Sequence, residues 1–228
     1  WAAMHNWIGI LISFVFVFSI LGIAQLLAAL KVLSPPVTRK FVHIGVSHWW
    51  IVAIPFFDSL AFALVGPVAF MVLNAFSLKR QLFSAMEIPD EPGKPVNLGT
   101  VYFPLSLFIL VLITFLTDMP RWIGGMSILV LGWGDGVAAV AGMVAGKRRY
   151  TTFGQRKSLI GSGAMFLFAL IVLLAYSYIH LPVSTRDIWL AAATTALVAT
   201  ALESLTPLGM DNLTIPIGTA LFYYGVFL

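Results

Sequence analysis

Eight apolar segments in this chain are each long enough to cross a lipid bilayer, and they constrain the fold more than any other feature. A transmembrane helix needs about 20 predominantly apolar residues, with a range of roughly 17 to 25. The predicted spans are residues 7–30, 41–57, 59–76, 99–117, 122–146, 159–180, 188–206 and 212–228. We therefore predict an all-α polytopic membrane protein with about eight transmembrane helices, built as a single integral membrane domain over residues 1–228.

The composition excludes several other classes of protein. The chain is 60% hydrophobic and 10% charged, whereas a soluble domain is about 45–50% apolar and about 25% charged. A soluble enzyme is therefore excluded. The chain has no cysteine, which also excludes a disulfide scaffold and cysteine-ligated zinc or iron–sulfur centres. The net charge of +4 does not indicate a nucleic-acid partner, because the bases lie in loops between apolar segments.

The distribution of basic residues predicts the orientation in the membrane. With eight spans, eleven bases fall on one face: Lys31, Arg39, Lys40, Lys79, Arg80, Lys94, Lys147, Arg148, Arg149, Arg156 and Lys157. Only Arg121 and Arg186 fall on the other face. Because basic loops stay in the cytoplasm, we predict that the first face is cytoplasmic and that both termini are non-cytoplasmic. Trp7, Trp122 and Trp189 begin spans at the opposite interface, as an aromatic belt would.

Asp135 is the clearest functional candidate, because an ionisable group inside a membrane span costs at least ~2.5–3.5 kcal/mol. Glycines flank it within residues 132–136, and such a segment can unwind where it lines a cavity. On a helix, Asp135 shares one face with Ala139, Gly142 and Gly146. That face is also typical of helix packing, with the acid paired to a distant base. We favour a functional carboxylate close to a metal ion or a phosphate.

The segment that follows is rich in bases and contains no acid. Its bases are Lys147, Arg148, Arg149, Arg156 and Lys157. Ser158, Gly161 and Ser162 come next, at the predicted start of a helix whose N–H groups, hydroxyls and positive end suit a phosphate. The spacing is not that of a Walker A loop, and a positive-inside loop would also explain the bases. We predict that these residues bind a polyphosphate group.

Two carboxylates, Glu203 and Asp211, flank a Pro/Gly turn between the last two spans, and Asn212 follows. Such hard oxygen ligands suit Mg²⁺ together with substrate phosphates. A polar turn in which Asp211 or Asn212 caps the last helix is the alternative. Since Asp135 lies on the same predicted side, we expect Asp135, Glu203 and Asp211 to hold a metal ion.

Three ionisable residues, Arg39, Lys40 and His43, lie at the entry to the second span. Arg39 and His43 are four residues apart and share a helical face. Bases that snorkel at the membrane boundary and a satisfied buried histidine are the ordinary explanation. We nevertheless include Arg39 and Lys40 as nucleotide-binding candidates and His43 as a catalytic candidate.

The order and spacing of these motifs resemble those of the CTP-dependent lipid-alcohol kinases. The matching segments are RKFVH at 39–43, GTVYFPL at 99–105, GDGVAAVAGMVAGKRR at 134–149, KSLIGSGAMF at 157–166 and ESLTPLGMDNLTIP at 203–216. The family includes dolichol kinase, phytol and farnesol kinase and yeast-type diacylglycerol kinase, and it is distantly similar to CDP-diacylglycerol synthase. The resemblance covers residues 39–217. Ile160 departs from it, because many members carry an acid at that position.

The resemblance implies that the γ-phosphoryl group of CTP is transferred to the hydroxyl of a polyprenol, a phytol-type prenol or diacylglycerol at the cytoplasmic leaflet. Mg²⁺ would be held by the three acids, and Lys157 would act on the transferring group. Glu203 and His43 are the two candidates for general base. The expected partners are CTP, the lipid alcohol and membrane lipids, without nucleic acid; self-association into a homo-oligomer stays open.

Two other functions fit some of the same residues. A cytidylyltransferase would use the same metal and nucleotide to make a CDP-lipid, but it would release pyrophosphate where a kinase releases CDP. A transporter of anions or lipids would show inverted repeats with paired broken helices. No such repeat is visible in the sequence.

Overall fold

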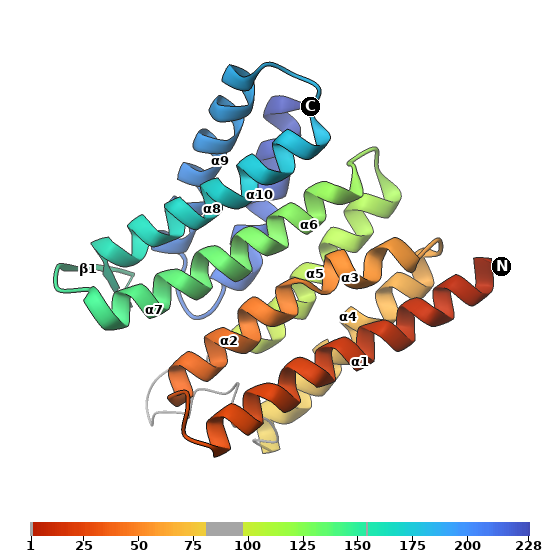
Figure 1. Cartoon of the computed structure of the whole chain (residues 1–228), viewed down its shortest axis with the longest axis horizontal. Coiled ribbons are helices and arrows are strands. Elements are labelled where there is room, and N and C mark those ends of the chain that lie inside the picture. Colours follow the sequence, from red (N-terminus) through yellow and green to blue (C-terminus); the bar gives the residue numbers. More distant parts are fainter. Residues whose placement is uncertain (1, 81–97, 154) are drawn as a thin grey trace.

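Long helices that run between two ends of the molecule make up the fold (Figure 1). The computed structural model describes residues 2–80, 98–153 and 155–228, so Lys94, one of the bases predicted to be cytoplasmic, lies outside the described residues. In chain order the elements are α1 (Ala2–Ala29), α2 (Pro35–Ser47), α3 (Trp49–Ala53), η1 (Ile54–Phe56), α4 (Leu60–Arg80), α5 (Gly99–Leu116), α6 (Arg121–Leu129), η2 (Val130–Asp135), α7 (Gly136–Ala145), β1 (Arg149–Thr152), β2 (Gln155–Ser158), α8 (Leu159–His180), α9 (Thr185–Leu205) and α10 (Asp211–Phe227).

The predicted fold class, an all-α polytopic membrane protein, is confirmed. Within the described residues, six helical segments are long and apolar enough to cross a membrane. They are α1, α4, α5, the continuous path from α6 to α7, α8 and α9. The other two predicted spans are an interrupted segment over residues 35–56 and α10, which has 17 residues. The total of eight crossings and their orientation therefore stay predictions.

The second predicted span, over residues 41–57, needs correction. The helix begins earlier, at Pro35, and its path is broken at His48. Proline fits the first turn of a helix, because its missing N–H has no helical partner there. At the break, Nδ1 of His48 lies 2.9 Å from the Ile44 carbonyl, and Nε2 accepts a hydrogen bond from Trp133 at 3.3 Å. The break is thereby tied to the helix that carries Asp135.

The predicted span over residues 122–146 forms, but it contains a π-helical turn, η2, that ends at Asp135. Such turns insert one extra residue into a helix and are frequent at functional sites. Glycines let α2 approach this turn closely. A Cβ on Gly132 would lie 2.2 Å from Oγ of Ser47, and one on Gly136 would lie 2.5 Å from the Ile44 side chain. A larger residue at either position would push α2 away from Asp135.

The basic segment at 147–158 is not the plain loop that we expected, because β1 and β2 pair there as an antiparallel hairpin. The hairpin lies against α7. A Cβ on Gly142 or Gly146 would come within 2.9 or 2.8 Å of Oγ of Ser158. The small-residue face that extends from Asp135 is thus a packing surface at these two glycines, as the alternative interpretation held.

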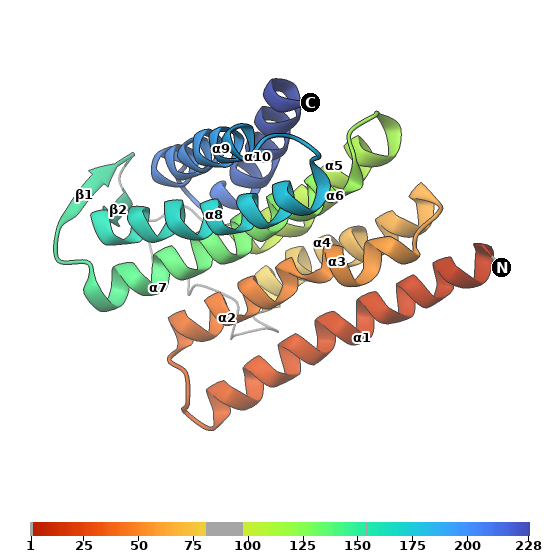
Figure 2. The same ribbon diagram turned by 45° about the horizontal axis from the view of Figure 1, so that its top comes forward.

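Both termini lie at the end of the bundle away from the hairpin, and Figure 2 shows the same separation from a second direction. The hairpin precedes α8 directly, and α9 follows soon after α8 ends. With a rise of about 1.5 Å per residue, the 22 residues of α8 separate these two connections by about 33 Å. That distance matches the thickness of a bilayer's hydrocarbon core.

Single cysteines will test the predicted orientation, because the chain has none of its own. Thr151 on β1 and Thr185 at the start of α9 are both exposed. In right-side-out and inverted vesicles, we expect a membrane-impermeant maleimide to label Thr151→Cys only from the cytoplasmic side and Thr185→Cys only from the opposite side. Labelling of both positions from the same side would contradict the orientation.

Candidate active site

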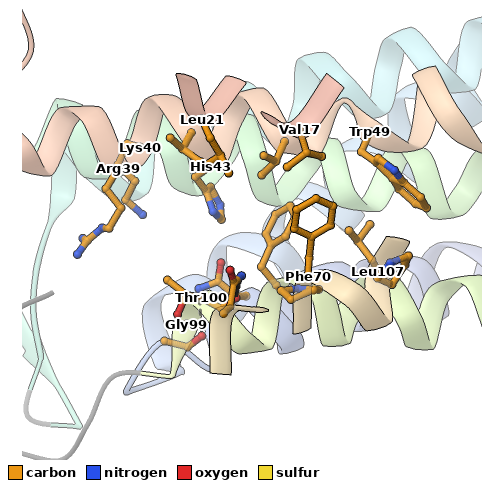
Figure 3. A pocket seen from close by; sticks show the side chains of 18 of the residues that line it. Val17, Leu21, Arg39, Lys40, His43, Trp49, Phe70, Gly99, Thr100 and Leu107 are labelled. Atoms are coloured by element: carbon orange, nitrogen blue, oxygen red, sulfur yellow. Dashed lines mark hydrogen bonds between the residues drawn. The ribbon is translucent and has the colours of Figure 1, made fainter. Parts of the chain in front are cut away.

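A cavity of about 210 Å³ lies between α1, α2, α4 and α5. One end, which we call the mouth, is lined by Arg39, Lys40, His43, Asp211 and Asn212. The apolar part, which we call the shaft, includes Val17, Leu21, Trp49, Phe70 and Leu107. Figure 3 shows the bases at one end of the cavity and Trp49 with Leu107 at the other. The cavity therefore joins a charged compartment to an apolar one.

A buried ion pair joins α2 to η2 beside the mouth. Nζ of Lys40 donates a hydrogen bond to Oδ2 of Asp135 at 2.6 Å, and the two side chains are 14% and 6% exposed. Nε2 of His43 lies 3.4 Å from the same oxygen, but it is too poorly aligned for a hydrogen bond. In the described part of the chain this buried nitrogen has no hydrogen-bond partner. Two candidates on α2, Lys40 and His43, are thus brought together with Asp135, which follows Lys40 by 95 residues.

A second carboxylate, Asp211, lies at the first residue of α10, just before the predicted last span. Its Oδ1 accepts hydrogen bonds from the backbone and side-chain amides of Asn212 at 2.9 and 3.1 Å. Burial and the nearby charge of Asp135 raise the pKa of Asp211 to about 6. Two carboxylates that disfavour each other's charge form an environment that suits a cation.

A second ion pair, Lys157 with Glu203, links β2 to α9. Nζ of Lys157 donates to Oε1 of Glu203 at 2.5 Å, and the side chains are 16% and 6% exposed. Burial opposes the charge of Lys157, but the carboxylates of Glu203, Asp211 and Asp135 outweigh it and raise the pKa of the ammonium group. Lys157 therefore keeps its positive charge. This charge interacts with Asp211 of the mouth and with Asp135 beside it.

A tyrosine that the sequence did not single out holds this second pair in place. The hydroxyl of Tyr150 on β1 lies 2.7 Å from Oγ of Ser162 and donates to Oγ of Ser204 at 2.9 Å. Ser204 in turn donates to Oε2 of Glu203 at 3.3 Å. This network anchors the hairpin to α8 and α9 and so positions Lys157. To single out Tyr150 from the sequence, one would have had to predict the hairpin and its register, because Tyr150 is the cross-strand partner of Lys157.

Several predicted nucleotide-binding residues lie apart from the cavity lining. Lys147, Arg148 and Arg149 are exposed to solvent at the start of the hairpin. Ser158 is buried and caps α8, because its Oγ accepts a hydrogen bond from the Gly161 amide at 3.0 Å. A phosphate would have to compete with that cap. The role of these residues in nucleotide binding stays a prediction.

Comparison with known proteins identifies the family. Over 227 residues the chain is 31% identical to the phytol kinase of Synechocystis sp., and the match covers 96% of this chain and 91% of that protein. This chain belongs to the phytol kinase family. It is also 27% identical to phytol kinase 1, chloroplastic, of Arabidopsis thaliana, over 85% of this chain and 67% of the plant protein. A probable phytol kinase 1, chloroplastic, of Glycine max is 27% identical, over 83% and 66%. No protein-family model and no solved structure matches the chain.

Membership of the phytol kinase family confirms the prediction of a membrane-bound lipid-alcohol kinase. The three acids predicted as metal ligands do not, however, form one cluster in the structure. Within residues 2–80, 98–153 and 155–228, no group of three or more histidine and acidic side chains is placed to hold a metal ion. Two of these acids instead pair with lysines, Asp135 with Lys40 and Glu203 with Lys157.

The cavity also contains polar side chains that sequence reasoning missed in this kinase. Nδ2 of Asn74 on α4 donates to the Thr100 carbonyl at 2.7 Å, and both residues line the cavity, as does Gln155 of the hairpin. Oγ1 of Thr100 is buried and has no hydrogen-bond partner among the described residues. Thr100 belongs to the GTVYFPL motif, which by its residues alone indicated only a helix start. Asn74 and Gln155 carried no signal.

The Lys157–Glu203 pair makes a prediction about the stability of this phytol kinase homologue. Glu203→Gln leaves Lys157 charged and largely buried without its partner, and breaking such a pair costs about 3 kcal/mol. We expect the apparent Tm in detergent to fall by roughly 6–12 °C. Because the pKa of Lys157 is raised, the pair persists below the ordinary lysine pKa, and the loss should be constant between about pH 6 and 9.

Asp118→Asn is the matched control, since Asp118 is an exposed acid in the connection between α5 and α6. It should leave the Tm within about 2 °C of the parent protein, as surface substitutions usually do. Equal Tm values for the two variants would contradict a structural role for the pair.

Proposed function

We propose that this protein transfers the γ-phosphoryl group of CTP to the hydroxyl of an isoprenoid alcohol, with phytol as the first candidate acceptor. The observation that carries the proposal is the cavity, in which a charged mouth opens onto an apolar shaft. The names of the relatives supply the acceptor. The resemblance to CTP-dependent lipid-alcohol kinases supplies the donor. The reaction would take place at the cytoplasmic face, where the basic loops are predicted.

The two compartments fit the two parts of the acceptor. An isoprenoid tail is apolar and gains free energy when it leaves water for an apolar cavity. Its hydroxyl would lie at the boundary between shaft and mouth, close to His43 and Thr100, both of which line the cavity. The hydroxyl of Thr100 and Nε2 of His43, which have no hydrogen-bond partner within the described residues, are the polar atoms that an alcohol group could satisfy there.

The mouth fits a nucleotide with a divalent cation. Phosphoryl transfer demands charge neutralisation and in-line positioning more than covalent chemistry from the protein. Asp135 and Asp211 would hold the Mg²⁺ ion that supplies part of this neutralisation when bound, because the charge of Asp135 acts on Asp211 and raises its pKa, a repulsion that a divalent cation would relieve. Lys40 on α2 and Lys157 on β2 bring positive charge to this cluster. Glu203 is the third candidate ligand, but Lys157 already engages its Oε1.

The proposed reaction breaks the bond between the γ-phosphorus and the oxygen that bridges the β- and γ-phosphates. The alcohol oxygen forms the new bond to phosphorus, CDP leaves, and the hydroxyl proton passes to a base. Of the two candidate bases, His43 fits better than Glu203. Its Nε2 has no hydrogen-bond partner in the described chain, whereas both oxygens of Glu203 are engaged, one by Lys157 and one by Ser204.

Transfer of labelled phosphate will test the proposed activity. Purified protein in detergent, supplied with phytol and Mg²⁺, should move label from γ-labelled CTP into the lipid and leave the label of α-labelled CTP in CDP. Asp135→Asn should lower turnover at least ~10²-fold, equivalent to about 2.7 kcal/mol. The side-chain shape is nearly kept, but a hard anionic ligand is lost.

Elution as a monodisperse species and an unchanged far-UV spectrum are required of Asp135→Asn, and Asp118→Asn again serves as the control acid. Label from α-labelled CTP in the lipid would indicate a cytidylyltransferase instead. Near-normal turnover of Asp135→Asn at saturating Mg²⁺ would show that the carboxylate is structural only.

The positions of Lys157 and Arg148 lead to a second prediction about the reaction. Lys157 is largely buried in the charged cluster, whereas Arg148 lies exposed before the hairpin. A charge needed in the transition state lowers kcat when it is removed, whereas one that binds ground and transition states equally raises KM. Lys157→Ala should therefore reduce kcat strongly. Arg148→Ala should raise the KM for CTP modestly, with an effect that shrinks in high salt.

Lys157→Arg should restore little of the activity, because a planar guanidinium does not replace a compact ammonium group in a tight site. The reverse pattern, in which Arg148→Ala abolishes kcat and Lys157→Ala changes only KM, would place the phosphate site near the start of the hairpin.

A further inference from the structure

The shaft ends at a large aromatic side chain, and the structure defines how far it extends from the mouth. His43 lines the mouth and Trp49 lines the far end. They are six residues apart on α2 and α3, which corresponds to about 9 Å of helix axis. The opposite wall agrees, since Thr100 and Leu107 on α5 are about 10 Å apart by the same rise.

Trp49 forms the floor of the shaft, and other side chains pack closely around it. Trp49 is only 2% exposed. Its indole ring lies against Gly66 of α4, where an added Cβ would come 3.4 Å from Cζ2. Behind it, the ring of Phe57 lies at a centroid distance of 6.4 Å and that of Trp50 at 6.3 Å. A straight chain that enters from the mouth therefore cannot continue past Trp49.

The depth of the α1 residues in the shaft follows from how α1 meets α2. Gly45 of α2 packs against Ile20, because a Cβ on Gly45 would lie 2.7 Å from Cγ2 of Ile20. The two helices run in opposite directions (Figure 1), so Leu21 lies near the mouth and Val17 lies deeper. Figure 3 agrees, since Val17 is drawn between Leu21 and Trp49.

We propose that Trp49 is the stop that determines how much of the acceptor's isoprenoid tail the enzyme binds. The inference rests on the proposed function and adds to it a residue that determines specificity for the acceptor's tail. With the hydroxyl held near His43, each buried methylene of the tail strengthens binding by roughly fourfold until the tail meets Trp49. Carbons beyond that point bend away and contribute nothing further. The length of the tail up to Trp49 therefore affects binding of the acceptor, and the length beyond Trp49 does not.

Acceptors of graded length will test this assignment. Dimethylallyl alcohol, geraniol and farnesol, each at the same mole fraction in the same detergent micelles, differ only in the number of isoprene units. For the wild-type protein we expect kcat/KM to rise from dimethylallyl alcohol to geraniol, whose two units reach Trp49, and to level off, within about twofold, from geraniol to farnesol. In Trp49→Ala the second step should rise at least about fivefold, because the floor is removed.

Trp49→Phe is the matched control, because it keeps an aromatic floor and should keep the wild-type ratios between the three alcohols. Identical ratios in the wild-type protein and Trp49→Ala would overturn the inference, although the kinase activity itself would stand. Absence of phosphorylation of phytol and of all three alcohols by the wild-type protein would overturn the proposed function, and the inference with it.

A second pair of variants covers the case in which Trp49→Ala does not fold. Val17 lines the deep part of the shaft, whereas Val15 on the same helix is 57% exposed. Val17→Phe should lower kcat/KM for geraniol relative to dimethylallyl alcohol by at least about fivefold, because it shortens the shaft. Val15→Phe should leave that ratio unchanged. Equal effects of Val17→Phe on both alcohols would contradict a depth-dependent stop.

Discussion

The buried pair of Lys40 and Asp135 is the interaction on which the rest of the structure depends. A carboxylate inside a membrane helix is costly unless it is paired, and the lysine comes from a helix 95 residues earlier in the chain. The pair therefore brings α2 against the π-helical turn that carries Asp135, at a distance that the glycines of that turn permit. Once α2 is placed there, His43 and Trp49 face the same cavity, one at each end.

This placement separates two chemical environments within one cavity. Beside its charged end, carboxylates and lysines neutralise one another in pairs, so that the charges are tolerated at low exposure. A nucleotide with its cation could exchange these partners without leaving any charge unpaired. Beyond His43 the walls are apolar and closed by Trp49. In the proposed reaction, the phosphate therefore meets fixed charges while the lipid tail stays out of water.

The fold was largely predictable from the sequence, and the candidate site was predictable in part. Residues 159–180 were predicted as a span, and α8 has the same bounds. The errors have physical causes. The second span was placed too late because Arg39 and Lys40 were interpreted as a membrane boundary, although they lie within α2 and line the cavity. The hairpin was missed because residues 147–158 show charge but no apolar alternation, which is the usual signal of a strand.

The sequence by itself determined that the chain lies in a membrane, because its long apolar segments have no soluble alternative. It also determined which ionisable groups need an explanation, since burying Asp135 or Glu203 in a membrane helix is costly wherever a partner is found. Only the tertiary structure decided which residues neutralise these acids. Lys40 rather than Lys157 neutralises Asp135, and Lys157 instead neutralises Glu203. The same holds for the shaft and its floor at Trp49, because periodicity specifies which face of a helix is apolar but not which other helix it meets.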